Sequence, residues 1–250
     1  MTRAVRRILF LVAGAALAWT FILAYSPMPP LGSVQSRYGD AVNAITVPER
    51  HITDAVTAVN FDIRGFDTLG EEFILFTSVL GTVLLMRRQE DEPAGDHEDK
   101  TPGRVIPRVS DAIRVTSLAL VPVTVLFGLY IVTHGQVSPG GGFQGGVILA
   151  SAPVLVYLCA EYKEFRSLLP LRLVAVAECI GAAAYILVGG LGLVLGGIFL
   201  QNVLPLGQNG SITGGGIVAL IDLGVGMEVG GGLSLALLVY LEELVEEKEE

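Results

Sequence analysis

Long apolar stretches alternate with polar segments along the whole chain. The hydrocarbon core of a bilayer is about 30 Å thick, so a spanning helix needs roughly 20 mostly apolar residues. Stretches of that kind cover residues 8–26, 69–86, 113–133, 143–160, 171–193 and 216–241. None alternates like a membrane-barrel strand, and backbone polar groups in lipid must be satisfied within the segment. The pattern predicts an all-α, polytopic membrane protein with about six transmembrane helices.

Composition and charge support this assignment. The chain is 52% hydrophobic and 16% charged, whereas about a quarter of the residues in a soluble domain are charged. Much of the net charge of -9 lies in two acidic segments, 89–107 and 242–250. Because these segments explain the acidity, it says little about partners, and we expect no nucleic acid among them.

The acidic segment near the middle of the chain predicts a division into parts. Residues 89–107 combine six carboxylates with three prolines and two glycines, which indicates a solvated cytoplasmic linker. We expect a two-helix membrane segment over 1–88, this linker, a four-helix membrane domain over 108–241 and an acidic tail over 242–250. Such a seam is what a fusion of two smaller membrane subunits would leave.

Basic residues near the span ends predict the orientation. They precede the first span, flank the linker and separate the fourth and fifth spans, so all fall on one side. We therefore expect both termini in the cytoplasm of a prokaryotic cell, with the chain in its inner membrane. An alternative for the first span is a cleaved signal peptide, because Arg3, Arg6 and Arg7 precede an apolar run that ends near Ser26.

A glycine-rich segment between the third and fourth spans predicts a shaped outward-facing hairpin. Glycine tolerates positive φ and close backbone approach, and proline fixes φ. The segment lacks the Lys-Ser/Thr of a phosphate loop and the strand of a dinucleotide site. The residues that we expect to build the turn are Pro139, Gly140, Gly141, Gly142 and Phe143.

Two sequence motifs carry a family resemblance. The run from His134 to Gly146, together with residues 214–229, resembles the MnhB (MrpB) subunit of multisubunit Mrp cation/proton antiporters, and the likeness covers residues 108–241. Residues 59–71 resemble the end of the large Mrp A subunit and the MbhE-type subunit of membrane-bound hydrogenases. The chain departs from many MnhB hairpins at Gln136, where they have His.

This resemblance implies a function and partners. The chain would be an accessory membrane subunit of an Mrp-type monovalent cation (Na+)/proton antiporter, in contact with other antiporter subunits, the bilayer, Na+ and H+. Cys159 and Cys179 lie at or within spans without metal spacing, and no catalytic constellation is evident. We therefore expect no metal, no cofactor and no enzymatic activity in this chain.

Ionisable residues within the spans are candidates for an ion pathway. A charge at mid-bilayer costs at least ~2.5 kcal/mol, so such a residue usually faces protein or water. Glu178, Asp222 and Glu228 qualify, and glycines surround Glu228. Burial favours the neutral form of a carboxylate, which suits a proton carrier or a sodium ligand. The alternative is that all three are hydrogen-bonded packing groups, or that Asp222 is wet at the outer surface.

Two further candidates lie near span ends. Asp67, Glu71 and Glu72 could form an acidic mouth beside a helix start, although Thr68 and Glu71 also match a capping box. His134 could titrate near neutrality or simply fix the turn.

Two other functions remain open from the sequence. The same module could move ions in a redox-driven complex of the hydrogenase or formate hydrogenlyase type, with the redox chemistry in partner chains. It could also be a purely structural membrane scaffold.

Overall fold

The computed structural model describes residues 3–30, 33, 36–86, 110–159 and 170–246. The expected linker over 89–107 lies outside them. Within these ranges the regular structure is helical. The elements in chain order are α1 (Arg3–Tyr25), α2 (Arg37–Arg50), α3 (Ala55–Ala58), the π-helix η1 (Val59–Ile63), α4 (Gly65–Leu85), α5 (Asp111–Thr133), α6 (Gly142–Cys159), α8 (Leu171–Gly196) and α9 (Val218–Glu246).

The predicted spans are confirmed. Six of these helices, α1, α4, α5, α6, α8 and α9, are long and apolar enough to cross a membrane. Their bounds agree with the sequence prediction to within a few residues. The differences are largest at α1, which begins at Arg3, and at α9, which continues to Glu246 into the segment expected as a tail; α4 begins slightly earlier than predicted, at Gly65.

The expected capping box is wrong. Thr68 would have to precede the helix, but α4 already begins at Gly65 and Thr68 lies inside its first turns. Arg64 occupies the N-cap position, with φ -129 and ψ 32. The π-helix η1 directly precedes this position, so the chain enters α4 from an existing helical segment and not from an extended one.

The chain forms two units, Met1–Ala41 and Val42–Glu250. The first contains α1, and every side chain of its span Ala4–Tyr25 that the structure describes is exposed. Helix α2 crosses the boundary between the units. The second unit holds the remaining helices and the whole candidate site.

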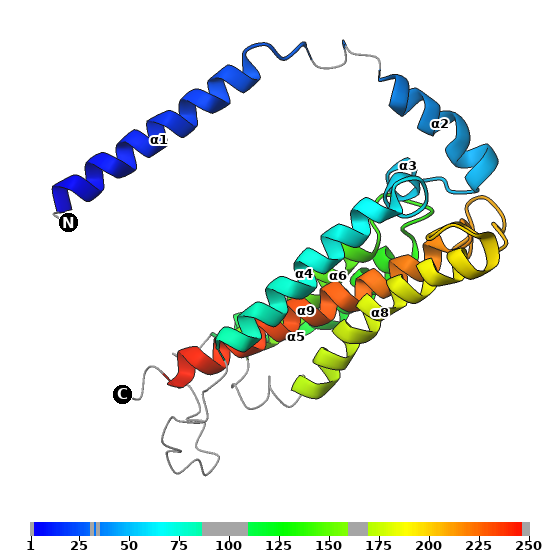
Figure 1. Ribbon diagram of the computed structural model, residues 1–250. Helices are drawn as coiled ribbons and strands as arrows, with labels where there is room; N and C mark the ends of the chain where they lie inside the picture. The colour runs from blue at the N-terminus through cyan, green and yellow to red at the C-terminus, as the bar shows by residue number, and fades with distance from the viewer. Residues whose placement is uncertain (1–2, 31–32, 34–35, 87–109, 160–169, 247–250) are drawn as a thin grey trace. The chain divides into compact units, whose positions relative to one another are not determined.

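Helix α9 is the centre of the second unit (Figure 1). It packs against α8, α6 and α4, and 56% of its most apolar window is buried, the largest share among the six spans. Small residues permit this packing. A Cβ on Gly181 of α8 would overlap the backbone at Glu228, and a Cβ on Gly146 of α6 would overlap Val229. The helix backbones therefore approach closely, as is common for membrane helices.

Helices α6 and α9 run in the same direction. Gly142 lies against Val225, and one turn later Gly146 lies against Val229. Helix α5 is antiparallel to α6, since Gly128 lies against Leu149 and Gly145 against Val132, and α8 is antiparallel to α9, since Gly181 lies against Gly224 and Gly231 against Glu178. The starts of α5 and α8 therefore share one end of the bundle with the ends of α6 and α9. The glycine hairpin is at the opposite end.

Candidate ion-pathway site

The glycine hairpin forms a turn that rests on α9. Gly140 and Gly141 have φ of 146° and 121°, values that L side chains rarely adopt. The N–H of Gly142 donates to Asp222 Oδ1 at 2.8 Å. Pro139 is exposed and Phe143 packs against the bundle core.

Asp222 is fully buried beneath this turn. The alternative that water reaches it at the outer surface is therefore wrong. Its carboxylate lies at the N-terminus of α6, where helix dipoles favour negative charge. A side chain at Gly135 or Gly141 would collide with that carboxylate. The glycines thus pack directly against Asp222, and Asp222 has a structural role in holding the hairpin.

His134 and Gln136 both hold the hairpin in place. His134 ends α5, its ring stacks on Tyr130 with centroids 4.0 Å apart, and its Nδ1 lies 2.9 Å from the Tyr130 carbonyl. Gln136 is buried, and its side-chain amide donates to the carbonyl of Ile212. The backbone carbonyl of Gln136 accepts a hydrogen bond from the N–H of Thr53 at 3.0 Å. These contacts favour the hypothesis that His134 fixes the turn.

Three carboxyl groups are buried in the interior, one from each of three helices. We call Glu72 of α4, Glu178 of α8 and Glu228 of α9 the acidic cluster; they are 2%, 4% and 1% exposed. Glu228 interacts electrostatically with both of the others. The sequence predicted all three as candidates but did not predict that they would be neighbours.

The pair Glu72 and Glu228 is unusual because the two carboxyls face each other without a proper partner. Within the described residues, none of their four oxygens is within a hydrogen bond of good geometry. Buried polar groups are normally hydrogen-bonded, and a buried charge needs a compensating charge. Two facing carboxylates in this position therefore require a shared proton or a cation to be stable.

Glycine makes room for the third carboxyl. A Cβ on Gly232 would lie 3.1 Å from Glu178 Oε1, and one on Gly231 would meet the backbone of Glu178. The glycine run after Glu228 therefore lets α8 bring its carboxyl against α9.

The three residues of the expected acidic mouth, Asp67, Glu71 and Glu72, lie on different faces of α4. Glu72 points into the bundle, whereas Glu71 and Asp67 are exposed. Asp67 forms an ion pair with Arg64 one turn earlier. Only Glu72 of the three belongs to the interior site.

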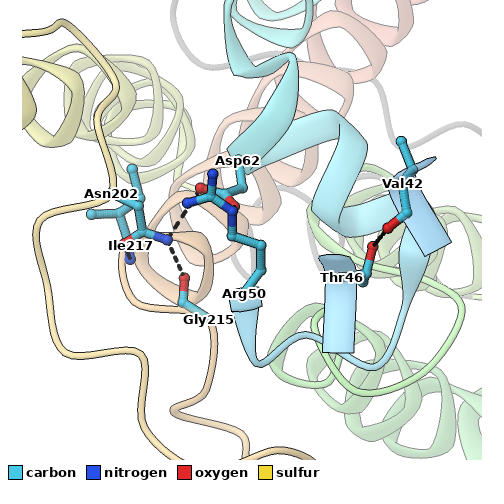
Figure 2. A network of polar contacts seen from close by, with 7 residues as sticks. All are labelled: Val42, Thr46, Arg50, Asp62, Asn202, Gly215 and Ile217. Carbon is cyan, nitrogen blue, oxygen red and sulfur yellow. Dashed lines mark hydrogen bonds and ion pairs between the residues drawn. The ribbon is translucent and has the colours of Figure 1, made fainter. Parts of the chain in front are cut away.

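A second polar group, outside the spans, ties the N-terminal segment to the loop between α8 and α9 (Figure 2). Arg50 Nε lies 3.3 Å from Asp62 Oδ2, and Asn202 Nδ2 donates to Asp62 Oδ1 at 3.2 Å. Asn202 also donates to the Gly215 carbonyl at 2.8 Å and accepts from the N–H of Ile217 at 3.1 Å. We call Arg50, Asp62 and Asn202 the polar clasp.

Burial dominates the electrostatics of the clasp. It raises the pKa of the Asp62 carboxyl, and the nearby Arg50 charge and the Asn202 hydrogen bond lower it only in part. Sequence reasoning did not identify the clasp, because Asn202 lies among ordinary loop residues and has no motif to mark it. A related contact holds α4 itself, since the buried Tyr185 hydroxyl donates to the Gly65 carbonyl at 2.8 Å.

Comparisons with known proteins agree with this architecture. Residues 112–235 match the family described as a domain related to the MnhB subunit of Na+/H+ antiporter. One Na+/H+ antiporter subunit of Bacillus subtilis is 36% identical over 131 residues, which are 50% of this chain and 88% of that protein.

Two solved structures share the fold. A chain of the membrane-bound sulfane sulfur reductase, an archaeal respiratory membrane complex, matches with a TM-score of 0.74 and 28% identity over 95% of this chain and 98% of that chain. A chain of the Mrp complex from Dietzia sp. DQ12-45-1b matches with a TM-score of 0.73 and 24% identity over 96% of this chain and 26% of that chain. Since the Bacillus subtilis relative is covered almost throughout, the chain belongs to the MnhB family.

Proposed function

We propose that the chain is an accessory membrane subunit of a multisubunit Mrp-type antiporter that exchanges a monovalent cation, Na+, for protons. The support is the family membership and the likeness to the Bacillus subtilis antiporter protein. The chain would contact other antiporter subunits and line part of an ion conduit. It would not itself be an enzyme.

The observation that carries the site is the facing pair of Glu72 and Glu228. Both carboxyls are buried at the interface of α4 and α9, interact with each other, and have no donor from another described residue. A purely structural scaffold would give such groups donors; Asp222 has one, since its Oδ1 accepts from the Gly142 N–H, although its Oδ2 has none among the described residues. The acidic cluster is therefore our candidate for a group that takes up and releases a proton or a sodium ion.

The N-terminal segment is part of the same proposal. Residues 1–88 would be an MbhE-like segment fused to the MnhB region through the linker 89–107. Its support is that this half supplies Glu72 and two members of the clasp, and so contributes to the same site. The even number of spans and the placement of the basic residues support an inner-membrane orientation with both termini in the cytoplasm.

A second function is favoured by a specific observation. The respiratory membrane complex chain is matched over 98% of its length, so a subunit of the same extent occurs in a redox-driven assembly. This chain would then move ions while partner chains carry out the electron transfer.

Purification of the tagged chain from its native membrane in mild detergent distinguishes the two functions. Mass spectrometry of the co-purifying proteins should identify antiporter-core subunits without iron–sulfur or nickel–iron proteins. Recovery of redox subunits would replace the antiporter proposal with the second function, and recovery of the chain alone from intact membranes would contradict both.

A further inference from the structure

Two neighbouring carboxyl side chains of α4 differ in the direction that they face. Glu72 is buried against α9, whereas Glu71 is exposed. Successive residues of a helix point about 100° apart, so a rotation of α4 by one residue position would turn Glu72 away from Glu228. The rotation of α4 about its own axis therefore decides whether the acidic cluster forms.

The local start of α4 does not fix this rotation. Arg64 at the N-cap makes no side-chain capping hydrogen bond, and its φ of -129° and ψ of 32° depart from helical values. The π-helix η1 before it also places its side chains out of step with those of an α-helix. Contacts with other helices must therefore set the rotation of α4.

Tyr185 of α8 contacts both segments that meet at Arg64. Its hydroxyl donates to the carbonyl of Gly65, the first residue of α4, at 2.8 Å. Its ring lies against Phe61 of η1, with centroids 6.4 Å apart and planes tilted by 57°. Tyr185 is 0% exposed, so its ring is packed on every side, and a hydrogen bond depends on direction as well as distance. This side chain thus holds the end of η1 and the start of α4 together.

The Tyr185 contact lies on the same stripe of α4 as Glu72. Gly65, Glu72 and Val79 are buried and follow one another at intervals of seven residues, which is about 20° short of two full turns. At the far end of the stripe, a Cβ on Gly232 of α9 would lie 3.2 Å from Val79 Cγ2. Glu72 is therefore midway between a hydrogen bond to α8 and an apolar contact with α9.

Helix α8 carries a matching stripe. Glu178 and Tyr185 are buried and are also seven residues apart, so they share one face of α8. Helices α4 and α8 are in contact, and Tyr185 interacts electrostatically with Glu72. One face of α8 therefore supplies both a carboxyl to the acidic cluster and the hydroxyl that holds α4.

We propose that Tyr185 is a positioning residue that sets the rotation of α4, so that Glu72 and not Glu71 faces Glu228. Tyr185 acts through Glu72 and does not itself bind the ion. Its importance for transport rests on the proposed function of the acidic cluster, whereas the rotation of α4 can be measured without reference to transport.

A disulfide between α4 and α9 measures this rotation. Val79→Cys and Gly232→Cys place two cysteines in contact on the stripe, and mild oxidation of the assembled complex, without the two native cysteines, should link them. Tyr185→Phe removes only the hydroxyl. It should lower the yield of the linked peptide, quantified by mass spectrometry, about fivefold, the effect of one lost hydrogen bond.

A second variant and a control complete the cross-linking test. Phe61→Leu removes the ring contact but retains the hydroxyl, and it should also lower the yield, by a smaller factor. It decides the question if Tyr185→Phe does not assemble. Tyr240→Phe removes a hydroxyl from an exposed position of α9 and should leave the yield unchanged. Unchanged cross-linking in both Tyr185→Phe and Phe61→Leu would overturn the proposal.

Transport measurements separate positioning from a general loss of stability. Tyr185→Phe should lower sodium-driven exchange about fivefold in the parent complex but less than about twofold when Glu72 is already Gln, because the two residues act as a unit. Equal reductions in the two backgrounds would show a structural role only and would overturn the proposal. If Glu72→Gln alone leaves exchange normal, the proposed function of the acidic cluster fails, and the cross-linking yield still decides the role of Tyr185.

Discussion

At the scale of single residues, Glu71 and Glu72 show how one position separates a surface group from a site group. Neighbours on a helix point about 100° apart, so Glu71 is exposed while Glu72 is 2% exposed and meets Glu228. The sequence offered both as candidates because they have the same chemistry. Only the packing of α4 on α9 distinguishes them.

Asp222 should behave as a structural group. Asp222→Ala removes the acceptor for the buried Gly142 N–H, and leaving a buried donor unsatisfied costs about 1–3 kcal/mol. We expect a lower thermal unfolding midpoint of the purified chain. Asp222→Asn retains an oxygen acceptor, so its unfolding midpoint should fall clearly less than that of Asp222→Ala. Equal losses for the two variants would contradict the hydrogen-bond account.

The ion pair of the clasp makes a prediction that depends on pH. Arg50→Gln leaves Asp62 buried without its cation. Because Arg50 is 40% exposed, we expect a loss of about 1–2 kcal/mol, less than for a fully buried pair. Burial raises the pKa of Asp62 in the folded protein, and removal of Arg50 raises it further.

The effect of Arg50→Gln on stability should depend on pH. Above the Asp62 pKa the buried carboxylate is charged and Arg50 stabilises it, whereas below this pKa the neutral acid gains nothing from Arg50. The deficit of Arg50→Gln should therefore shrink as the pH falls, and Asp62→Asn in the same background should remove the pH dependence. The measurement is the unfolding midpoint across pH. A deficit that grows on acidification would show that another group is responsible.

At the scale of elements, glycines fix how closely the helices pack. Gly181 of α8 lies against the backbone of α9 at Glu228, whereas a Cβ on Gly190 of the same helix would meet nothing within 4 Å. Gly181→Ala should push the helices apart and cost about 1–3 kcal/mol, as overpacking does. Gly190→Ala should be neutral or stabilising by about 0.5–1 kcal/mol, because alanine leaves the unfolded chain less conformational freedom to lose than glycine does.

Thermal unfolding in detergent, read alongside the yield of folded protein, compares these two alanine variants. A Gly181→Ala variant as stable as the parent would show that α8 and α9 are not held at the distance described here.

The π-helix before α4 explains why local sequence signals failed at this point. An extra residue per turn shifts the register of side chains, and such turns often occur at functional sites. Thr68 and Glu71 match a start signal, but the π-helix η1 ends one residue before α4, and α4 begins at Gly65 after the Arg64 N-cap. The true start of α4 is held by a distant residue, Tyr185, that no local pattern indicates.

At the scale of the whole molecule, the polar clasp and α4 join the N-terminal segment to the four-helix region. If the linker is only a tether, the chain cut within residues 89–107 should reassemble from two co-expressed pieces. Co-purification of the tagged C-terminal piece with the N-terminal piece is the measurement. Asn202→Ala combined with Thr53→Val removes clasp and hairpin contacts and should weaken this recovery. Pieces that never associate would contradict the role of these contacts.

Sequence reasoning identified the spans because length and apolarity are local properties of each segment. The glycine-rich composition also predicted a turn between α5 and α6, and Gly140 and Gly141 have positive φ in it. It could not find the pairing of Glu72 with Glu228 or the clasp at Asn202. Periodicity says which face of a helix is buried but not which helix covers it, and these contacts join residues more than a hundred positions apart.

Proton movement driven by a sodium gradient, measured in inverted membrane vesicles that contain the assembled complex, is the most direct test of the account. Glu228→Gln and Glu72→Gln preserve side-chain size but remove the group that exchanges a proton or binds Na+, while Glu71→Gln makes the same change on the exposed side of α4. We predict that the first two reduce exchange at least about tenfold, equivalent to ~1.4 kcal/mol, with the complex still assembled, and that Glu71→Gln leaves it near the parent level. Normal exchange in both Glu228→Gln and Glu72→Gln would contradict the proposed role of the acidic cluster.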